Sequence, residues 1–461
     1  CFATTSAARR NENQGKRGTG MGKGKKRLIM IRTLALFTAL TLYPFPFALS
    51  PRVVSARIDP ASISTATLEG RLAVFDDAWS RINDRYYDET FHGIDWEAQR
   101  INFRALAAKT ETSIELYDVL RRMIASLNDP HTRVFAPEEK FDWWRPRFVT
   151  VGLSLAEIDG LPTVVKVDAN SAPERAGIRP GDVIETVNGE TALLRIQQRL
   201  TTTAEAPPSV RFRAFAKLLD GPAGTNVAVG WKTKAGKRKT ALLVRYWQQR
   251  ELGMRFRREG EIAVIEIDAF TKPIAAAFAR AVKEKLSGAR GVVLDLRGNG
   301  GGDAEAMSDM ASSFISAGTN LGLFTDRSGT SFRISTHTKS LVTPYVIQKT
   351  ELPLIVLTSE RTASAAEILV EALRTSRRAK IMGTQTCGCV LAVRTRHLLP
   401  DGGLLDVSEL DYETAAGERL EKHGINPDVT VSIERKDLYA RRDRAIESAI
   451  DRLSRLQSGH H

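Results

Sequence analysis

Cysteine, long apolar runs and nucleotide-binding patterns are all scarce in this chain of 461 residues. Only three cysteines occur, Cys1, Cys387 and Cys389, and no pair of His or Cys residues has the spacing of metal ligands. After residue 56 no apolar run is long enough to cross a membrane. No glycine cluster is followed by Gly-Lys-Ser/Thr, so a P-loop is excluded. We therefore expect neither a metal nor a cofactor.

Positive charge is concentrated at one end of the chain. The net charge is +13, but residues 1–50 alone contain nine Lys and Arg and a single Glu. The remainder is only mildly basic, and no basic stripe interleaved with aromatic residues stands out. A nucleic-acid partner is therefore not expected.

The N-terminal segment has the pattern of an export signal. Residues 1–20 are polar, which favours an upstream extension with the true start at Met21 or Met30. A Lys- and Arg-rich stretch, an apolar stretch over about 28–49 and the small residues around Ala56 follow. This order predicts an extension and signal peptide over 1–56 and export to the periplasm or cell envelope. The alternative is an uncleaved segment that associates with the membrane.

The next segment, 57–148, is predicted to be an N-terminal helical region. Apolar and aromatic residues recur there at helical spacing, as in Leu72, Phe75 and Trp79. The helices are expected to end at Asn128-Asp-Pro-His-Thr132, because proline cannot continue a helix.

The stretch around Ser364 predicts a strand, a tight turn and a helix. Leu354-Ile-Val-Leu357 is a short apolar run, and good helix formers follow Ser364. A hydroxyl in the first helical turn lies beside free backbone N–H groups, which favour an oxyanion. A nucleophilic serine needs such a site. The same residues, Ser364-Ala-Ala-Glu367, also form a capping box, which would make Ser364 a structural cap.

A second stretch, Gly291-Val-Val-Leu-Asp-Leu-Arg-Gly-Asn-Gly-Gly-Gly-Asp303, predicts a buried strand, a loop of clustered glycines and a helix from about Glu305. Glycines adopt positive φ and let backbone N–H groups approach a ligand. A phosphate-binding turn and a plain strand-to-helix turn are the alternatives.

Together these stretches resemble the carboxyl-terminal processing (tail-specific) proteases and the related tricorn-type serine peptidases. The matching motifs are Asp295-Leu-Arg-Gly-Asn-Gly-Gly-Gly302, Thr362-Ala-Ser-Ala-Ala-Glu367 and Leu127-Asn-Asp-Pro-His-Thr132. The resemblance implies a multidomain α/β fold with a ClpP/crotonase-like protease core, which we place at 247–435. A C-terminal helix is expected over 436–461.

Residues 149–246 resemble a PDZ domain. The specific match is Ser171-Ala-Pro-Glu-Arg-Ala-Gly-Ile-Arg-Pro-Gly-Asp-Val-Ile-Glu-Thr-Val-Asn-Gly189. PDZ domains bind polypeptide C-termini by adding a strand to a sheet edge. The resemblance implies peptide binding by Val151, Gly152, Leu153, Ser154 and Leu155.

The base of the reaction is where this chain departs from the processing proteases. They use a Ser–Lys dyad, and Cys389 stands at the position of that Lys. In tricorn-type members the base is a His, which here is His131, and a Glu completes the site, which here lies in Glu421-Lys-His-Gly-Ile-Asn-Pro-Asp428. The resemblance implies Ser364 as nucleophile, His131 as base and Glu421 as orienting carboxylate.

The oxyanion would bind the backbone N–H of Ala365 and of Gly300 or Gly301. A solvated Glu421 and a base at His423 are the alternatives to this assignment. An imidazole of ordinary pKa, about 6.5, would make activity fall below about pH 6.

The predicted function is that of an exported serine endopeptidase that captures polypeptides, by their C-termini, with its PDZ domain. The alternative is a catalytically inactive peptide- or apolar-ligand-binding protein on the same fold. Cys387 and Cys389 either form a disulfide, or Cys389 fills the place of the Lys as a small apolar residue.

Overall fold

The computed structural model describes residues 63–139, 142, 145–200, 208–343 and 346–458. The predicted extension and signal peptide over 1–56 lie outside the described residues. Within the described part, no helix combines the length and the apolarity that a membrane crossing requires.

Three helices follow residue 67, and each has a polar N-cap. They are α1 (Leu68–Arg85), α2 (Trp96–Ala107) and α3 (Ser113–Ala125). The side chains of Thr67, Asp95 and Thr112 each accept a hydrogen bond from an amide of the first turn. The buried faces of the three helices share one core with Leu405 and Val407, almost three hundred residues further along the chain.

A small antiparallel sheet holds that distant segment beside α3. Its strands are β1 (Arg133–Phe135), β18 (Leu404–Asp406) and β17 (Arg396–Leu398), in the order β1-β18-β17. The fully buried Asp406 accepts hydrogen bonds from Arg133 and Arg396. The turn that contains His131 leads directly into β1, so this sheet fixes where that turn lies.

Residues 147–249 contain a separate sheet in the order β3-β4-β5-β7-β8, with β6 (Glu190–Thr191) paired to β5. The strands are β3 (Leu153–Ile158), β4 (Leu161–Val167), β5 (Val183–Val187), β7 (Asn226–Lys232) and β8 (Arg238–Val244). The helices are α4 (Ala172–Ala176), α5 (Ala192–Leu200) and α6 (Pro208–Ala216), and β2 (Arg147–Thr150) pairs with β9 (Tyr246–Gln249). Among the described strands, β4 alone pairs with β3, so β3 has an open edge.

The C-terminal half of the chain contains a six-stranded sheet in the order β10-β11-β12-β15-β16-β20. The strands are β10 (Met254–Glu259), β11 (Ile262–Ile267), β12 (Gly291–Asp295), β15 (Leu354–Thr358), β16 (Ala379–Gly383) and β20 (Val429–Thr430). All neighbours are parallel except β10 and β11. Parallel strands covered on both faces read as continuous apolar runs, which explains why β12 and β15 are so evident in the sequence.

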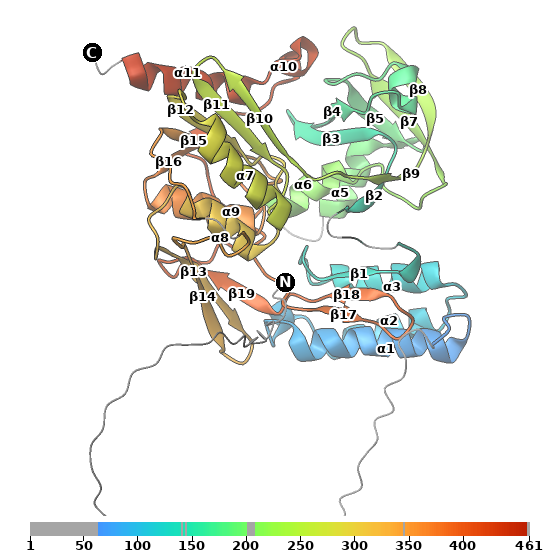
Figure 1. Cartoon of the computed structure of the whole chain (residues 1–461). Coiled ribbons are helices and arrows are strands. Elements are labelled where there is room, and N and C mark those ends of the chain that lie inside the picture. Colours follow the sequence, from blue (N-terminus) through green and yellow to red (C-terminus); the bar gives the residue numbers. More distant parts are fainter. Residues whose placement is uncertain (1–62, 140–141, 143–144, 201–207, 344–345, 459–461) are drawn as a thin grey trace, which may run out of the picture. The chain divides into compact units, whose positions relative to one another are not determined.

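Helices cover both faces of this sheet (Figure 1). One face carries α7 (Lys272–Lys285), α8 (Ala304–Ser312) and α9 (Ala365–Thr375), and the other carries α11 (Arg444–Ser458). Alternate residues of β15 serve the two faces, since Val356 packs with α9 while Ile355 and Leu357 pack with α11. The predicted mixed α/β class is confirmed.

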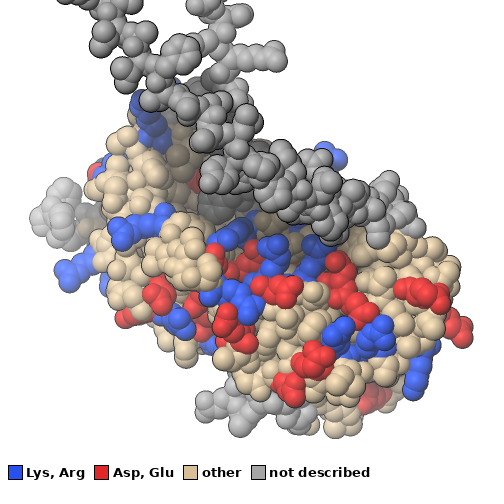
Figure 2. Space-filling model, turned by 90° about the horizontal axis from the view of Figure 1, so that it is seen from below, with Lys and Arg blue, Asp and Glu red and all other residues tan. Residues whose placement is uncertain are grey.

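Two further features accompany the six-stranded sheet. Another three-stranded sheet, in the order β14-β13-β19, contains β13 (Asn320–Asp326), β14 (Ser331–Ser335) and β19 (Leu410–Glu413). The C-terminal segment contains two helices, α10 (Arg435–Ala440) and α11, where the sequence suggested one. On the face drawn in Figure 2, basic and acidic side chains are intermingled over the coloured residues.

Candidate active site

Ser364 lies in the turn between β15 and α9, as the residue just before the helix. Its backbone angles are φ 57° and ψ −128°, in a region that a residue with a Cβ atom rarely adopts. Strain of this kind persists only where surrounding contacts fix it, and it clusters at active sites. A strained serine between a strand and a helix is also the arrangement of a nucleophile elbow, which exposes the hydroxyl. The geometry therefore fits a nucleophile.

The hydrogen bonds between Ser364 and Glu367 involve the backbone of Ser364 rather than its hydroxyl. The Glu367 carboxylate accepts the Ser364 N–H at 3.1 Å. The Glu367 N–H donates to the Ser364 carbonyl oxygen at 2.8 Å, and Ser364 makes no side-chain cap hydrogen bond, although the two residues face each other as a capping box. The hydroxyl is thus not required to close the helix.

Within the described chain, two of the three backbone N–H groups expected to bind the oxyanion are free, and the third is occupied. The Ala365 and Gly300 N–H groups have no acceptor among the described residues. The Gly301 N–H, in contrast, donates to Asn299 Oδ1 at 2.8 Å. Gly301 has φ 95°, and a Cβ atom on it would lie 2.7 Å from Ser364 Cβ. Gly301 therefore permits the close approach of the loop, while Ala365 and Gly300 keep the available donors.

A buried carboxylate, that of Glu367, organises the loop beside Ser364. Glu367 is fully buried and accepts hydrogen bonds from Thr386 Oγ1 at 2.5 Å, Gly388 N at 2.8 Å and Cys389 N at 2.9 Å, besides that from Ser364. Burial raises the pKa of Glu367, and these donors oppose that shift. From the sequence alone only the capping-box role of Glu367 is evident, because its other partners lie about twenty residues away.

Cys387 and Cys389 form a disulfide, which settles the alternative left open by the sequence. The Cys387 N–H donates to the Thr362 carbonyl oxygen at 2.9 Å, and the Cys389 carbonyl oxygen accepts the Ser364 N–H at 2.8 Å. The loop therefore contacts the nucleophile turn through its backbone. Neither sulfur atom of this disulfide can act as a base.

His131 lies in the turn between α3 and β1, half-buried, with its Nδ1 atom buried. Nδ1 is 3.8 Å from Asp129 Oδ1 and makes no hydrogen bond among the described residues. Burial lowers the pKa of His131 to about 4, against the opposing effect of Asp129. The imidazole is therefore neutral over a wider pH range than its ordinary pKa implies, and the expected activity limit near pH 6 moves to lower pH.

Glu421 is not a solvated surface carboxylate. Its Oε2 accepts hydrogen bonds from Val390 N at 2.7 Å and Leu391 N at 3.2 Å, just after the disulfide loop. Burial is the main cause that raises its pKa to about 8, and the negative charges of Asp129 and Glu367 add to it. His423, the rival base, is exposed.

The predicted residues are therefore joined to different extents. Ser364, Ala365 and Gly301 are in direct contact, and the disulfide loop links Ser364 to the segment that Glu421 binds. Among the described residues, no hydrogen bond joins His131 to Ser364 or to Glu421. His131 is linked to the rest of the candidate site electrostatically, because the charge of Asp129 acts on both His131 and Glu421.

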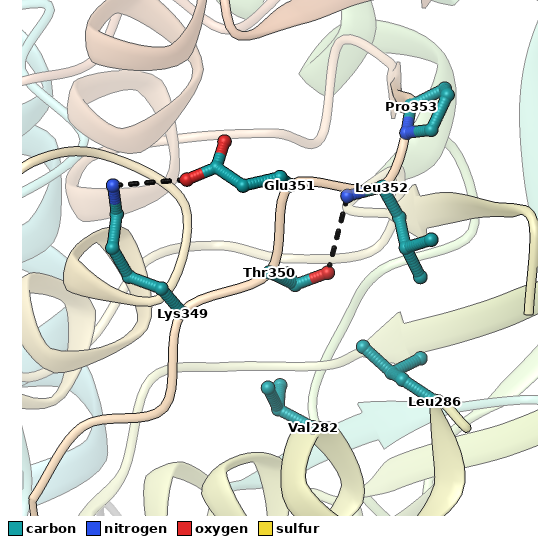
Figure 3. A pocket seen from close by; sticks show the side chains of 7 residues that line it. All are labelled: Val282, Leu286, Lys349, Thr350, Glu351, Leu352 and Pro353. Atoms are coloured by element: carbon teal, nitrogen blue, oxygen red, sulfur yellow. Dashed lines mark hydrogen bonds and ion pairs between the residues drawn. The ribbon is translucent and has the colours of Figure 1, made fainter.

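A surface depression of about 470 Å³ lies elsewhere in the core (Figure 3). Its lining residues are Val282, Leu286, Lys349, Thr350, Glu351, Leu352 and Pro353. They precede β15, whereas Ser364 follows that strand at its other end. The depression is therefore not part of the candidate active site.

Comparison with known families supports the same core. The model of peptidase family S41 matches residues 261–431, and that of the tricorn protease C1 domain matches 69–125. A chloroplastic carboxyl-terminal-processing peptidase 2 of Arabidopsis thaliana is 30% identical over 377 residues, which are 77% of this chain and 68% of that protein. A chloroplastic C-terminal processing peptidase of Tetradesmus obliquus is 28% identical over 81% of this chain and 80% of its own.

Solved structures extend the comparison to the fold. The photosystem II D1 C-terminal processing protease has 27% identity and a TM-score of 0.50, covering 78% of this chain and 93% of its own. Mature CPAF complexed with lactacystin has a TM-score of 0.64 at 13% identity, over 85% of this chain and 98% of its own, which is a likeness of fold alone. With the family model spanning the glycine loop, the Ser364 turn and Glu421, this chain belongs to peptidase family S41, the serine peptidases that include the carboxyl-terminal processing proteases.

Proposed function

We propose that this chain is an exported endopeptidase that cleaves unfolded or C-terminally presented polypeptides, with Ser364 as nucleophile, His131 as base and Glu421 as third member of the site. The conformation of Ser364 carries the proposal. Its strained turn, the unpaired N–H of Ala365 and the close packing of Gly301 are what a serine nucleophile with an adjacent oxyanion site requires.

The chemistry begins with proton transfer from Ser364 to His131, because a serine hydroxyl is a weak nucleophile until a base accepts its proton. With its lowered pKa, His131 is neutral at pH 7 and able to accept. Ser364 Oγ attacks the peptide carbonyl, and the N–H groups of Ala365 and Gly300 stabilise the resulting oxyanion. His131 then protonates the leaving amine, and water releases the acyl group by the reverse sequence.

The absence of the dyad lysine supports a histidine base. Cys389 is in a disulfide and is buried. Such a sulfur has no proton to exchange and no free lone pair of useful basicity. The base is therefore assigned to another segment, and His131 is the candidate because the charge of Asp129 acts on both its ring and Glu421.

Substrate capture is assigned to the PDZ-like sheet. The open edge of β3, preceded by Val151 and Gly152, is suited to the addition of a peptide strand. Helix α6 lies beside this edge, where Arg211 forms an ion pair with Glu157 of β3. A groove between a strand edge and a helix is the place where PDZ domains hold a peptide C-terminus. Proteolysis at C-termini, as named for the D1 processing protease, is the corresponding activity.

Export is proposed from the basic and apolar pattern that ends near Ala56. N-terminal sequencing of protein from the cell envelope tests it. A mature chain that begins near residue 57 supports a cleaved signal, and one that begins at Met21 or Met30 indicates an anchor.

The nucleophile is tested with a serine-directed fluorophosphonate and a denatured polypeptide substrate. The wild-type protein and the Ser376→Ala control, which alters an exposed serine at the far end of α9, should label and cleave. Ser364→Ala should do neither.

Failure of the wild-type protein to label, together with tight binding of peptides, would instead support the non-catalytic peptide-binding alternative. Labelling of Ser364→Ala would show that another serine is the nucleophile.

A further inference from the structure

Asp129, two residues before His131, is the most heavily bonded carboxylate near the proposed base. It is 9% exposed. Its Oδ1 accepts the His131 N–H at 2.8 Å, and its Oδ2 accepts the Thr132 N–H at 3.1 Å and the hydroxyls of Thr132 and Ser408, each at 2.5 Å. All four partners donate, which is what an ionised carboxylate, an acceptor only, can satisfy. The turn that contains His131 therefore also contains a buried negative charge, that of Asp129.

The same carboxylate faces the imidazole ring. Within 4 Å of a ring nitrogen of His131, the described residues contribute one carboxylate oxygen, Asp129 Oδ1, at 3.8 Å from Nδ1. That nitrogen is buried and has no hydrogen bond within the described structure. Glu421 directs its carboxyl to the backbone N–H groups of Val390 and Leu391 instead. Catalytic hydrogen bonds are often long in the free enzyme and shorten when substrate binds.

Asp129 is held in place by a second segment of the chain as well as by its own turn. Ser408 lies 279 residues away, and its N–H also donates to Thr132 Oγ1 at 3.1 Å. The Ser408 carbonyl oxygen in turn accepts the Tyr87 N–H at 2.9 Å. The segment with Ser408 leads directly into β19. Asp129 is thereby held from both sides, as a supporting group must be if it is to keep another side chain in a productive position.

We propose that Asp129 is a positioning residue, the carboxylate that orients the His131 ring through Nδ1–H and stabilises the imidazolium formed when Ser364 gives up its proton. This inference rests on the proposed role of His131 as base. The proposed site then contains a fourth residue besides Ser364, His131 and Glu421. This carboxylate is part of the sequence motif, but the motif alone gives it no role. By keeping Nδ1 protonated, Asp129 leaves Nε2 as the proton acceptor.

Four charged groups act on the His131 ring, and they predict how its titration should change. Asp129 and Asp406 favour the protonated ring, whereas Arg133 and Arg213 disfavour it. Removing the charge of Asp129 removes a favourable interaction with the imidazolium, so the pKa of His131 should fall further. A variant that merely loosened the turn would expose the ring to water and move the pKa toward its ordinary value instead.

The test is a double-mutant cycle on Asp129→Asn and His131→Ala, with Asp118→Asn of α3, an exposed carboxylate, as the matched control. Each is measured as kcat/KM on a denatured polypeptide across pH, with thermal melting to verify folding. Asp129→Asn should lower kcat by about 10²–10⁴-fold with KM nearly unchanged, and should move the acidic limb of the profile to lower pH. When His131 is already Ala, adding Asp129→Asn should lower kcat/KM by less than about a further threefold, because the two residues act as one unit.

The outcomes separate this inference from the proposed function. If His131→Ala is inactive while Asp129→Asn is as active as Asp118→Asn, the base stands and Asp129 is excluded. Asp129 is likewise excluded if Asp129→Asn lowers kcat/KM by the same factor with His131 present and with His131 replaced by Ala. If His131→Ala retains activity, the proposed base is wrong, and Asp129 cannot act through it.

Should Asp129→Asn fail to fold, the wild-type enzyme provides the decisive measurement. A low-field proton resonance of His131 Nδ1–H, absent from His131→Ala, should be visible after labelling with a fluorophosphonate. Its absence would overturn the assignment.

Discussion

The backbone N–H of Ser364 donates a 2.8 Å hydrogen bond to the carbonyl oxygen of Cys389. The resemblance to the processing proteases puts Cys389 at the position of their lysine. That position contacts Ser364, the proposed nucleophile, but it has no amine to act as a base. The contact runs through the backbone, so it does not depend on the side chain of residue 389. The disulfide with Cys387 restrains the loop that makes it.

The disulfide is therefore expected to support activity without taking part in the reaction. Cys389→Ser should keep most of the activity, with a loss below about tenfold, because Glu367 and Thr362 still hold the loop. Its melting temperature should fall, since the cross-link is lost. Turnover and melting of the variant, with thiol titration of the wild-type protein, measure this. Complete loss of turnover in a folded Cys389→Ser protein would place the Cys-Gly-Cys loop in the chemistry.

Glu367→Gln is expected to destabilise the protein by about 2–4 kcal/mol, because an amide NH₂ group would face backbone N–H donors in a fully buried site. Activity should fall as well, since the Ser364 N–H is one of the groups that Glu367 binds. Denaturant unfolding of this variant beside Glu418→Gln, an exposed control, makes the comparison. Equal stability of the two variants would show that the buried carboxylate is not the centre of this loop.

Glu421 should make stability depend on pH. The pKa of Glu421 in the folded protein, about 8, lies above its ordinary value. The protonated carboxyl therefore contributes fully to the free energy of unfolding below about pH 4.5, and this stability is lost as the pH rises through 8. Glu421→Gln should match the wild-type stability near pH 4 and exceed it at pH 9, by on the order of 5 kcal/mol. Unfolding free energies at both pH values measure the difference. A variant that is less stable than wild type at pH 9 would contradict a raised pKa.

The edge of β3 should distinguish peptide acids from amides. The open edge of β3 offers backbone N–H groups to a terminal carboxylate, whereas the Gly152 N–H already donates to Thr150 Oγ1 at 2.9 Å. A peptide with an apolar free C-terminus should therefore bind much more tightly than its C-terminal amide. Calorimetric titration of the Ser364→Ala protein with both peptides avoids cleavage during the measurement. Equal affinities would exclude a carboxylate-binding loop at residues 151–155.

The strands and turns around the candidate site could be predicted from sequence because their signals are local. The apolar runs of β12 and β15 and the glycine loop between β12 and α8 identify a strand–turn–helix unit without any knowledge of distant contacts. What could not be predicted depends on contacts between remote segments. Glu367 shows one helical role in sequence but binds a loop about twenty residues away, and Asp129 meets Ser408 across 279 residues. The left-handed φ of Ser364 and the lowered pKa of His131 likewise follow from packing and burial, which no motif encodes.

The central claim, that His131 is the base for Ser364, is tested most directly by the activity of His131→Ala beside Ser364→Ala and His423→Ala. Members of one catalytic unit fail together, so His131→Ala should lose kcat/KM about as severely as Ser364→Ala, by roughly 10³-fold or more, while His423→Ala stays near wild type. The wild-type acidic limb should lie near the lowered pKa, about 4, because activity is lost as the imidazole becomes protonated with falling pH. Near-normal turnover of His131→Ala, with loss of activity in His423→Ala or Cys389→Ser, would contradict the account.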